Sequence, residues 1–366
     1  MESVIIAINN WLTKEDFDNR IFDPARTDGK HVLMNRFRGE VERRGGKVVT
    51  LDTVDFHDPA VKHVVYFDYS WKYAKIDPFL DRIPFDKRAL VIMEPCNINP
   101  SLYYINSYRK RFATIFTWDH NLQRQHPEYV PINVPITEDM DEYRTPRFAA
   151  IPFAEKKLVI AINSNRWSYM PQSSYALRIK YYQYFDRAYP EQFDLYGVGW
   201  NQPCIFYEKW LGFPHFKTFR RPTNSYTEKP ELLSRYRFTL CIENNPSQPG
   251  YISEKITDSF CARCVPVYYG WQGINNLIPR DTWIDMRDFK TPATLGAFLA
   301  GMAPTTHQRY LEAIDRFIQS DAARFFTPAN FFGTIATRLG LTAAEKNTTR
   351  LASKQTGTGD TQWERL

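Results

Sequence analysis

The chain has 366 residues, of which 43% are hydrophobic and 24% are charged. At roughly 150 residues per domain, this length predicts about two domains, and the composition excludes a wholly disordered chain and a coiled coil. No apolar run approaches the length of about 18 residues that suggests a membrane span. With 47 basic and 41 acidic residues, the net charge of +6 suits an anionic ligand or membrane surface without requiring nucleic acid.

The N-terminus and the cysteines indicate a compartment. The apolar stretch at residues 4–8 follows no basic region and ends at Asn9, which is too early for a secretory signal. Five cysteines, an odd number, favour buried reduced thiols over a disulfide framework. Cys261 and Cys264 match C-x-x-C but have no second cysteine pair for zinc. We therefore expect a cytoplasmic protein, with at most peripheral membrane contact.

Short apolar runs alternate with helical patterns through the first part of the chain. A helix is predicted at 31–44, and it ends at Gly45. The predicted strands are residues 4–8, 47–50, 63–67, 89–93 and 115–118. This alternation of strand and helix predicts a parallel sheet.

Residues 129–154 are rich in proline and polar side chains, and we expect them to form the crossing between domains. The second series of predicted strands is 157–162, 194–196, 238–242, 264–268 and 283–285. Its predicted helices are 173–189, 231–236, 252–263, 305–320 and 328–339. The fold class expected is α/β, with two doubly wound, Rossmann-like domains facing each other across a cleft. The expected divisions are an N-terminal domain at 1–150, a second domain at 151–340, and a polar, disordered tail at 341–366.

Several familiar motifs are missing or weak. The sequence contains neither a complete G-x-G-x-x-G fingerprint nor a Walker A loop. The main sequence evidence for a dinucleotide oxidoreductase or a P-loop enzyme is therefore missing. Two D-x-D pairs occur, at 16–18 and 139–141. Because two carboxylates at that spacing arise easily by chance, we expect no metal site at either pair.

The most informative stretch joins a buried strand, a loop rich in proline, and the first turn of a helix. It reads FTLCIENNPSQPGYISEK from Phe238 to Lys255. Ligands of α/β domains bind at such strand ends, and a helix N-terminus with Lys255 favours a diphosphate. Glu254 could accept hydrogen bonds from a ribose diol, and Tyr251 could cover a sugar or phosphate. The local pattern fits equally well an ordinary helix capped near Ser253.

This stretch, with VPVYYG from Val265, resembles the signature of the α1,3/4-fucosyltransferase family of glycosyltransferases. Three further stretches resemble the family in the same order: KKLVIAINSN from Lys156, FDLYG from Phe193, and LIP followed by WIDMRDF from Leu277. The clear resemblance covers residues 156–290, and the first half matches only in layout. The segments at 166–171 and 245–249 depart from the family pattern, so we expect reshaped donor loops.

The resemblance implies a fold of the GT-B type, with a site for a GDP-sugar in the second domain. The donor-binding side chains that it implies are Arg178, Asn244, Tyr251, Glu254 and Lys255. Arg178 would contact the diphosphate, offsetting charge on the departing GDP without a metal, so no obligatory metal or other cofactor is expected. Lys180 and Arg166 are the alternatives to Arg178, and we expect Glu243 to brace the loop.

An inverting transfer needs a base that takes the proton of the acceptor hydroxyl. Glu94 follows the strand predicted at 89–93, and the family has a glutamate base at the corresponding strand end. Glu94 is therefore the predicted catalytic residue, with Asp119 and His120 as the next candidates.

The function implied by the resemblance is transfer of L-fucose from GDP-β-L-fucose to a hydroxyl of a glycan containing GlcNAc or Glc, in α1,3- or α1,4-linkage. The acceptor would be an oligosaccharide or glycolipid of bacterial lipopolysaccharide or capsule synthesis, at the inner face of the membrane. Two alternatives stay open: a transferase that uses another GDP-sugar, and a catalytically silent protein that binds nucleotide or glycan.

Overall fold

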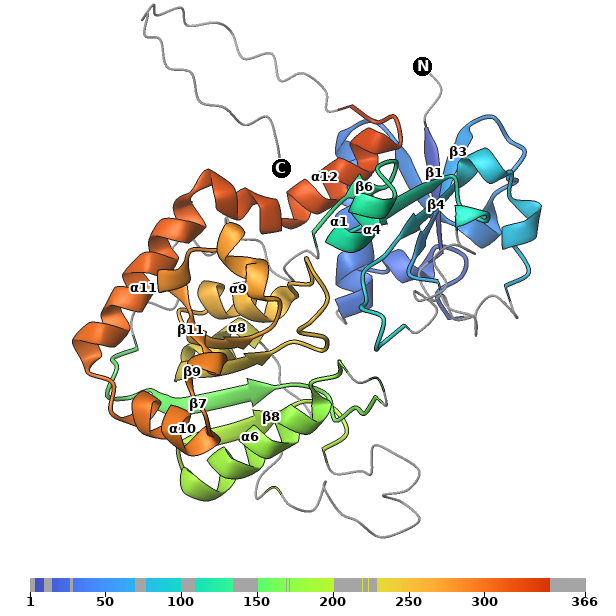
Figure 1. The fold of residues 1–366 in the computed structure, drawn as a ribbon. Helices are drawn as coiled ribbons and strands as arrows, with labels where there is room; N and C mark the ends of the chain where they lie inside the picture. Colours follow the sequence, from blue (N-terminus) through green and yellow to red (C-terminus); the bar gives the residue numbers. More distant parts are fainter. Residues whose placement is uncertain are drawn as a thin grey trace, which may run out of the picture.

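The chain folds around two parallel β-sheets, which lie in separate halves of the molecule (Figure 1). The computed structural model describes residues 4–9, 15–26, 29–69, 77–99, 109–133, 151–168, 170, 172–200, 219, 223 and 229–342. The predicted tail at 341–366 lies almost wholly outside the described residues. The D-x-D pair at 139–141 and most of the expected crossing between domains lie outside them as well.

The first sheet has six strands in the order β2-β1-β3-β4-β5-β6. The strands are β1 (Ile5–Asn9), β2 (Lys47–Thr50), β3 (Val61–Phe67), β4 (Arg88–Val91), β5 (Thr114–Thr117) and β6 (Val130–Pro131). Helix α1 (Gly29–Arg43) connects β1 to β2, and α4 (His120–Gln125) follows β5. The five predicted strands are confirmed within a few residues. Strand β6, two residues long, and α4, six residues long, are too short for a periodic pattern.

The second sheet has five strands in the order β11-β10-β9-β7-β8, again all parallel. Its strands are β7 (Lys157–Ile162), β8 (Phe193–Tyr196), β9 (Tyr236–Ile242), β10 (Val265–Tyr269) and β11 (Ile284–Asp285). The helices of this half are α6 (Tyr175–Ala188), α8 (Lys229–Ser234), α9 (Glu254–Cys261), α10 (Pro292–Ala300) and α11 (Pro304–Gln319). Of these, α10 was not predicted, because its run of apolar residues has no clear polar face.

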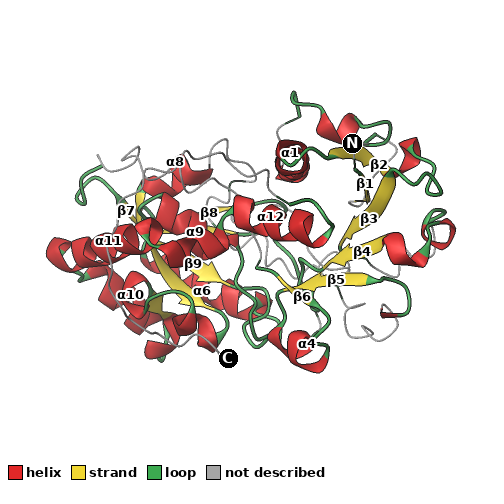
Figure 2. Cartoon of the chain, turned by 90° about the horizontal axis from the view of Figure 1, so that it is seen from above, coloured by secondary structure: helices red, strands yellow, loops and turns green. Residues whose placement is uncertain are grey.

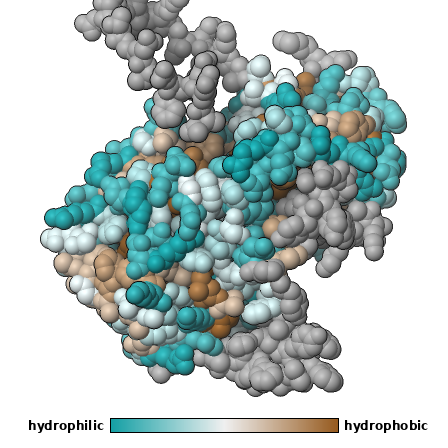
Figure 3. Space-filling model, in the orientation of Figure 1, coloured by the Kyte–Doolittle hydropathy of each residue, from teal (hydrophilic) through white to brown (hydrophobic). Residues whose placement is uncertain are grey.

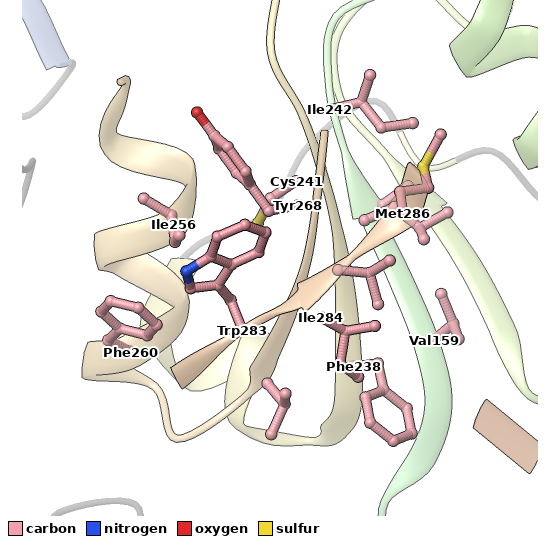
Figure 4. Packing of buried hydrophobic residues seen from close by; sticks show 14 of the residues in the cluster. Val159, Phe238, Cys241, Ile242, Ile256, Phe260, Tyr268, Trp283, Ile284 and Met286 are labelled. Atoms are coloured by element: carbon pink, nitrogen blue, oxygen red, sulfur yellow. The ribbon is translucent and has the colours of Figure 1, made fainter. Parts of the chain in front are cut away.

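Large apolar side chains from the sheet and from α9 fill the core of the second half (Figure 4). Ile256 and Phe260 on α9 point toward the strands, where the rings of Tyr268 and Trp283 meet edge to face with centroids 5.4 Å apart. Burial of four such side chains contributes about 1.5 to 3 kcal/mol each. This packing fixes the start of α9, where two of the predicted donor-binding residues lie.

The last described helix, α12 (Pro328–Arg338), packs against the first half of the molecule. Its Phe332 ring lies 5.5 Å from that of Phe37 on α1, and Arg44 donates a hydrogen bond to Thr337 at 2.9 Å. Figures 1 and 2 both show α12 beside the N-terminal sheet. The sequence predicted a second domain at 151–340 with closing C-terminal helices. Of these helices, α12 follows that domain in sequence and packs against the first domain in space.

The two sheets share one topology. In each, the first strand lies between the second and the third, so that the chain changes direction at β1/β3 and at β7/β9. Ligands of doubly wound domains bind beyond the carboxyl ends of the strands at such a switch point. The face in Figure 3 is largely hydrophilic, with small apolar patches. Among the described residues, no helix combines the length and apolar character that crossing a bilayer requires.

Candidate functional site

A pocket lies at the switch point of the second sheet, beyond the carboxyl ends of β7 and β9, and the first domain closes one side of it. Four of the five predicted donor-binding residues and the predicted base contribute to its wall, and Tyr251 does not. The lining residues are Glu94, Ile98, Ile162, Asn163, Ser164, Arg166, Tyr175, Arg178, Gly197, Val198, Lys229, Asn244, Glu254 and Lys255. The structure thus brings residues from 94 to 255 into one cleft.

Arg178 is a buried cation in this wall. Its side chain projects from α6 toward the end of β9, where its guanidinium donates to the carbonyl of Ile242 at 3.1 Å and to Oδ1 of Asn244 at 2.8 Å. The residue is 3% exposed, and within the described part of the chain none of its hydrogen bonds goes to a carboxylate. A buried charge without a counterion is costly, so this arrangement favours an anion in the pocket.

Lys255 lies in the first turn of α9 among acidic and hydroxyl groups. Its ammonium donates to Oγ of Ser253 at 2.8 Å and to Glu243 at 3.3 Å, and Glu254 lies 3.9 Å away. Burial alone would lower the pKa of Lys255, but the carboxylates of Glu254 and Glu243 outweigh it and raise that pKa. Lys255 is therefore charged at neutral pH, beside the helix N-terminus that also favours anions.

Glu243 holds this corner of the pocket together, as the sequence predicted. Its fully buried carboxylate accepts hydrogen bonds from the backbone N–H of Ser253 at 2.8 Å and from its hydroxyl at 2.7 Å. Burial opposes ionisation of the neighbouring Glu254, but Lys255 and Lys229 outweigh it and lower the pKa of Glu254. Glu254 is thus an ionised acceptor that faces the pocket, which suits a diol.

Asn244 and Tyr251 are adjacent but differ in their exposure to the pocket. Asn244 lines the wall and accepts from Arg178, while its amide donates to the hydroxyl of Tyr251 at 3.4 Å. The Tyr251 ring is buried against Trp118 of the first domain, with centroids 4.8 Å apart. The predicted cover over a sugar is therefore not formed by this ring in the structure, and its contact with the pocket runs through Asn244.

Glu94 lies in the loop after β4 and faces the pocket from the first domain. Burial raises the pKa of Glu94; Lys255 and Arg166 oppose the shift, and Glu254 and Glu243 add to it. A carboxylate with a raised pKa is a stronger proton acceptor once ionised, which suits a general base.

Asp68, which the sequence analysis did not identify, holds the Glu94 loop. Its buried carboxylate accepts from the backbone N–H of Met93 at 2.8 Å and from that of Glu94 at 3.2 Å. The indole of Trp118 donates to the carbonyl of Met93 at 2.9 Å, on the other side of the loop. Burial, with Glu94 nearby, raises the pKa of Asp68 to about 7. A lone Asp at a strand end gives no motif, so only the fold could identify this role.

We predict that Asp68→Ala destabilises the first domain, because two buried backbone N–H groups lose their acceptor. The expected loss is about 1 to 3 kcal/mol, which lowers the thermal midpoint by about 2 to 4 °C per kcal/mol. Thermal unfolding followed by circular dichroism measures it. Asp68→Asn keeps one acceptor oxygen and should lose less than half as much; equal losses in the two variants would show that these hydrogen bonds do not support the loop.

Of the alternatives to Glu94 and Arg178 that the sequence offered, only Arg166 lines the pocket. Asp119 caps α4 through one oxygen, accepting from Asn121 at 2.8 Å, and its other oxygen accepts from Gln248 at 2.8 Å. The ring of His120 packs edge to face on Trp271. Neither Asp119 nor His120 lines the pocket, whereas Arg166 does; Lys180 lies exposed on α6, away from the wall.

Sequence reasoning missed Lys229, Tyr175 and Gly197 in the pocket wall. Lys229 begins the short helix α8, where it bonds Asp258 at 2.5 Å, and no local pattern marks it. Gly197 could have been found from FDLYG: its φ is +130°, and a Cβ there would lie 2.1 Å from the carbonyl oxygen of Asn163. Only glycine allows β7 and β8 to end this close together.

The fold is shared with solved glycosyltransferases. An α1,3-fucosyltransferase crystallised with GDP-fucose aligns with a TM-score of 0.51 at 15% identity, covering 92% of this chain and 90% of that one. HepE from Anabaena, in complex with UDP-glucose, aligns with a TM-score of 0.52 at 12% identity, covering 92% and 98%. The two parallel sheets and their cleft are therefore those of a GT-B glycosyltransferase fold.

Sequence comparison finds similarity to fucosyltransferases in the second half of the chain. Residues 154–318 match the model of "Glycosyltransferase family 10 (fucosyltransferase) C-term", so this part of the chain is similar to that family. The alpha-(1,3)-fucosyltransferase FucT of Helicobacter pylori is 36% identical over 62 residues, which are 17% of this chain and 13% of that protein. The fucosyltransferase FUT6 of Pan troglodytes is 36% identical over 105 residues, 28% of each chain. The matches thus span less than a third of these two relatives.

Proposed function

We propose that the chain is an inverting fucosyltransferase that moves L-fucose from GDP-β-L-fucose to a hydroxyl of a glycan containing GlcNAc or Glc, in α1,3- or α1,4-linkage. The observation that carries the proposal is the buried Arg178 guanidinium, which faces the pocket with Lys255 and no carboxylate partner among the described residues, while Glu94 faces the same pocket from the opposite domain. The similarity of residues 154–318 to this family and the fold shared with a fucosyltransferase bound to GDP-fucose support this donor.

The proposed reaction uses each group in one role. Glu94 takes the proton of the acceptor hydroxyl while that oxygen attacks the anomeric carbon of fucose from the face opposite GDP. The bond between the anomeric carbon and the phosphate oxygen breaks, and GDP leaves with the electron pair. Arg178 and Lys255 stabilise the negative charge that gathers on the diphosphate. Attack from the opposite face converts the β-linkage of the donor into the α-linkage of the product.

We propose that the chemical step requires no metal, because Arg178 and Lys255 already supply positive charge where the diphosphate would lie. The ribose hydroxyls would donate to Glu254, whose lowered pKa keeps it ionised. EDTA should then leave the transfer rate within about twofold, since no metal-bound water or phosphate is lost. A loss that added Mg²⁺ or Mn²⁺ restores would contradict this part of the proposal.

Product analysis tests the function as a whole. The chain is incubated with GDP-fucose and an N-acetyllactosamine acceptor, and proton NMR of the product reports the anomeric configuration and the linkage. An α-linked fucose on GlcNAc is expected. GDP-mannose and other GDP-sugars are tested in parallel. The loop at 245–249 differs in sequence from the family pattern, so the identity of the donor sugar has to be determined by experiment. GDP binding without transfer from any donor would favour a silent nucleotide-binding protein.

For the physiological setting we propose lipopolysaccharide or capsule synthesis in a bacterial cytoplasm, with an oligosaccharide or glycolipid acceptor at the inner face of the membrane. The local identity to a protein of the bacterium Helicobacter pylori supports only the bacterial part of this setting. Transfer to a lipid-linked oligosaccharide, compared with the same free oligosaccharide, measures whether the acceptor lipid matters.

A further inference from the structure

The loop between β9 and α9, at residues 244–251, departs from the family pattern and leaves its own domain to contact the other one. The amide of Gln248 donates to Asp119 at 2.8 Å, and its carbonyl oxygen accepts from the backbone N–H of Cys96 at 3.3 Å. Gln248 therefore bonds two separate segments of the first domain, one after β4 and one after β5.

Backbone groups of the 244–251 loop bond the first domain on either side of Gln248. The N–H of His120 donates to the carbonyl of Pro249 at 3.1 Å, and the side-chain amide of Asn97 donates to the carbonyl of Asn244 at 3.0 Å. These contacts join the domains at both ends of the loop, so the loop bridges them along its whole length.

Gly250 permits the close approach at the end of the loop. Its φ is +89°, and a Cβ at this position would lie 2.3 Å from the carbonyl oxygen of Trp118. Only glycine fits both the backbone conformation and the space. The ring of the next residue, Tyr251, packs at a tilt of 52° against the ring of Trp118. Main chain and rings thus lie in direct contact across the domain boundary.

The 244–251 loop connects the surroundings of Arg178 with those of Glu94, and the proposed reaction depends on the position of these two residues relative to each other. At one end, Asn244 holds the Arg178 guanidinium. At the other, Cys96 and Asn97 belong to the same short segment as Glu94. The loop therefore ties the donor-binding wall to the segment that carries the base. Because a misplacement of about 1 Å can cost about a hundredfold in rate, such a connection has direct catalytic value.

We propose that the 244–251 loop is a clasp between the two domains and that Gln248 is its positioning residue, which fixes Glu94 relative to the bound donor. This inference deepens the proposed function and rests on it for its catalytic part. The clasp itself, a physical link between the domains, does not depend on which sugar is transferred.

Exchanging the donor and acceptor roles of Gln248 and Asp119 tests the clasp. Gln248→Glu sets a carboxylate against that of Asp119, and we expect kcat for transfer to fall at least tenfold while the affinity for GDP stays within about twofold. Adding Asp119→Asn supplies an amide donor to the new carboxylate, while its remaining oxygen still caps α4. The double variant should recover to within about threefold of the parent. Gln308→Glu, exposed on α11 and far along the chain from the clasp, makes the same change of charge and should leave kcat unchanged.

Small-angle X-ray scattering of the GDP-free chain separates failure of the clasp from failure of the proposed function. Gln248→Glu should increase the radius of gyration, and the double variant should restore it, even if no donor is ever transferred. Parental kcat and radius in Gln248→Glu would overturn the proposal, and so would a double variant as impaired as the single one. If Gln248→Glu does not fold, Gln248→Ala gives the same comparison without repulsion, and a parental kcat in that variant overturns the proposal.

Discussion

Replacing Glu94 by glutamine is expected to lower the transfer rate by a factor of about 10² to 10⁴, with GDP affinity almost unchanged. The substitution keeps the shape of the side chain and removes its ability to accept a proton. Glu94 faces the pocket from the other domain, and among the described residues no hydrogen bond joins its carboxylate to Arg178 or Lys255, so the loss of its charge should change nucleotide binding little. Initial rates with saturating GDP-fucose, combined with calorimetry of GDP binding, measure the two effects separately.

The pH dependence of the transfer rate is a second test of Glu94 as the proposed base. Because burial raises the pKa of Glu94, the acid limb of the transfer rate should lie above the ordinary glutamate value of about 4.3. The rate falls as the pH drops through that raised pKa, since a protonated carboxyl group accepts no proton. This limb should be absent from the residual activity of Glu94→Gln.

A matched control is Glu128→Gln, a half-exposed carboxylate of the same domain that pairs with Arg109 at 2.9 Å on the surface. It should leave rate and binding unchanged. If Glu94→Gln kept more than about a tenth of the parental transfer rate, Glu94 would not be the base, because removal of a general base costs at least a hundredfold. Parallel losses in GDP affinity, rate and thermal stability would instead indicate a structural glutamate.

The strands were predictable because buried parallel strands have continuous apolar runs, as in the segment LVIAI of β7. The order of the strands could not be predicted from the sequence. The meeting of Glu94 with Lys255 could not be predicted from the residues around Glu94 or from those around Lys255 alone. The meeting of the two residues in one cleft was expected from the resemblance to a known fold and from the rule that ligands bind at strand ends, whereas no order of the strands was predicted. Residues such as Arg178 and Glu254 were located because a family pattern marks their positions.

Residues whose role depends on contacts between distant segments could not be predicted. Asp68 and Asp119 are both lone aspartates after strands, yet one holds the Glu94 loop and the other bonds Gln248. Nothing local distinguishes them, which is why Asp119 could stand as an alternative base in the sequence. Likewise α12 has an ordinary amphipathic pattern, and only packing shows that it covers the first domain.

The second large effect is expected on GDP binding, when the two cations of the proposed diphosphate site are removed. Arg178→Ala and Lys255→Ala are each expected to weaken GDP binding about ten- to a hundredfold, because each removes a charge-assisted contact worth about 1.5 to 3 kcal/mol. Isothermal titration calorimetry with GDP measures the change. Arg178 lacks a carboxylate partner among the described residues, so its removal leaves no buried counterion behind.

Lys255→Ala differs, because it leaves the buried Glu243 carboxylate without its cation. It should therefore also lower the thermal midpoint of the apo protein. Arg178→Ala takes the guanidinium donor away from the carbonyl of Ile242 and from Oδ1 of Asn244, and we expect it to lower the midpoint as well. Lys180→Ala removes an exposed cation two residues after Arg178 on the same helix, and we expect it to bind GDP as the parent does. Parental GDP affinity in both Arg178→Ala and Lys255→Ala would show that the diphosphate binds elsewhere. An equal loss in Lys180→Ala would indicate a general electrostatic attraction instead of two specific phosphate contacts.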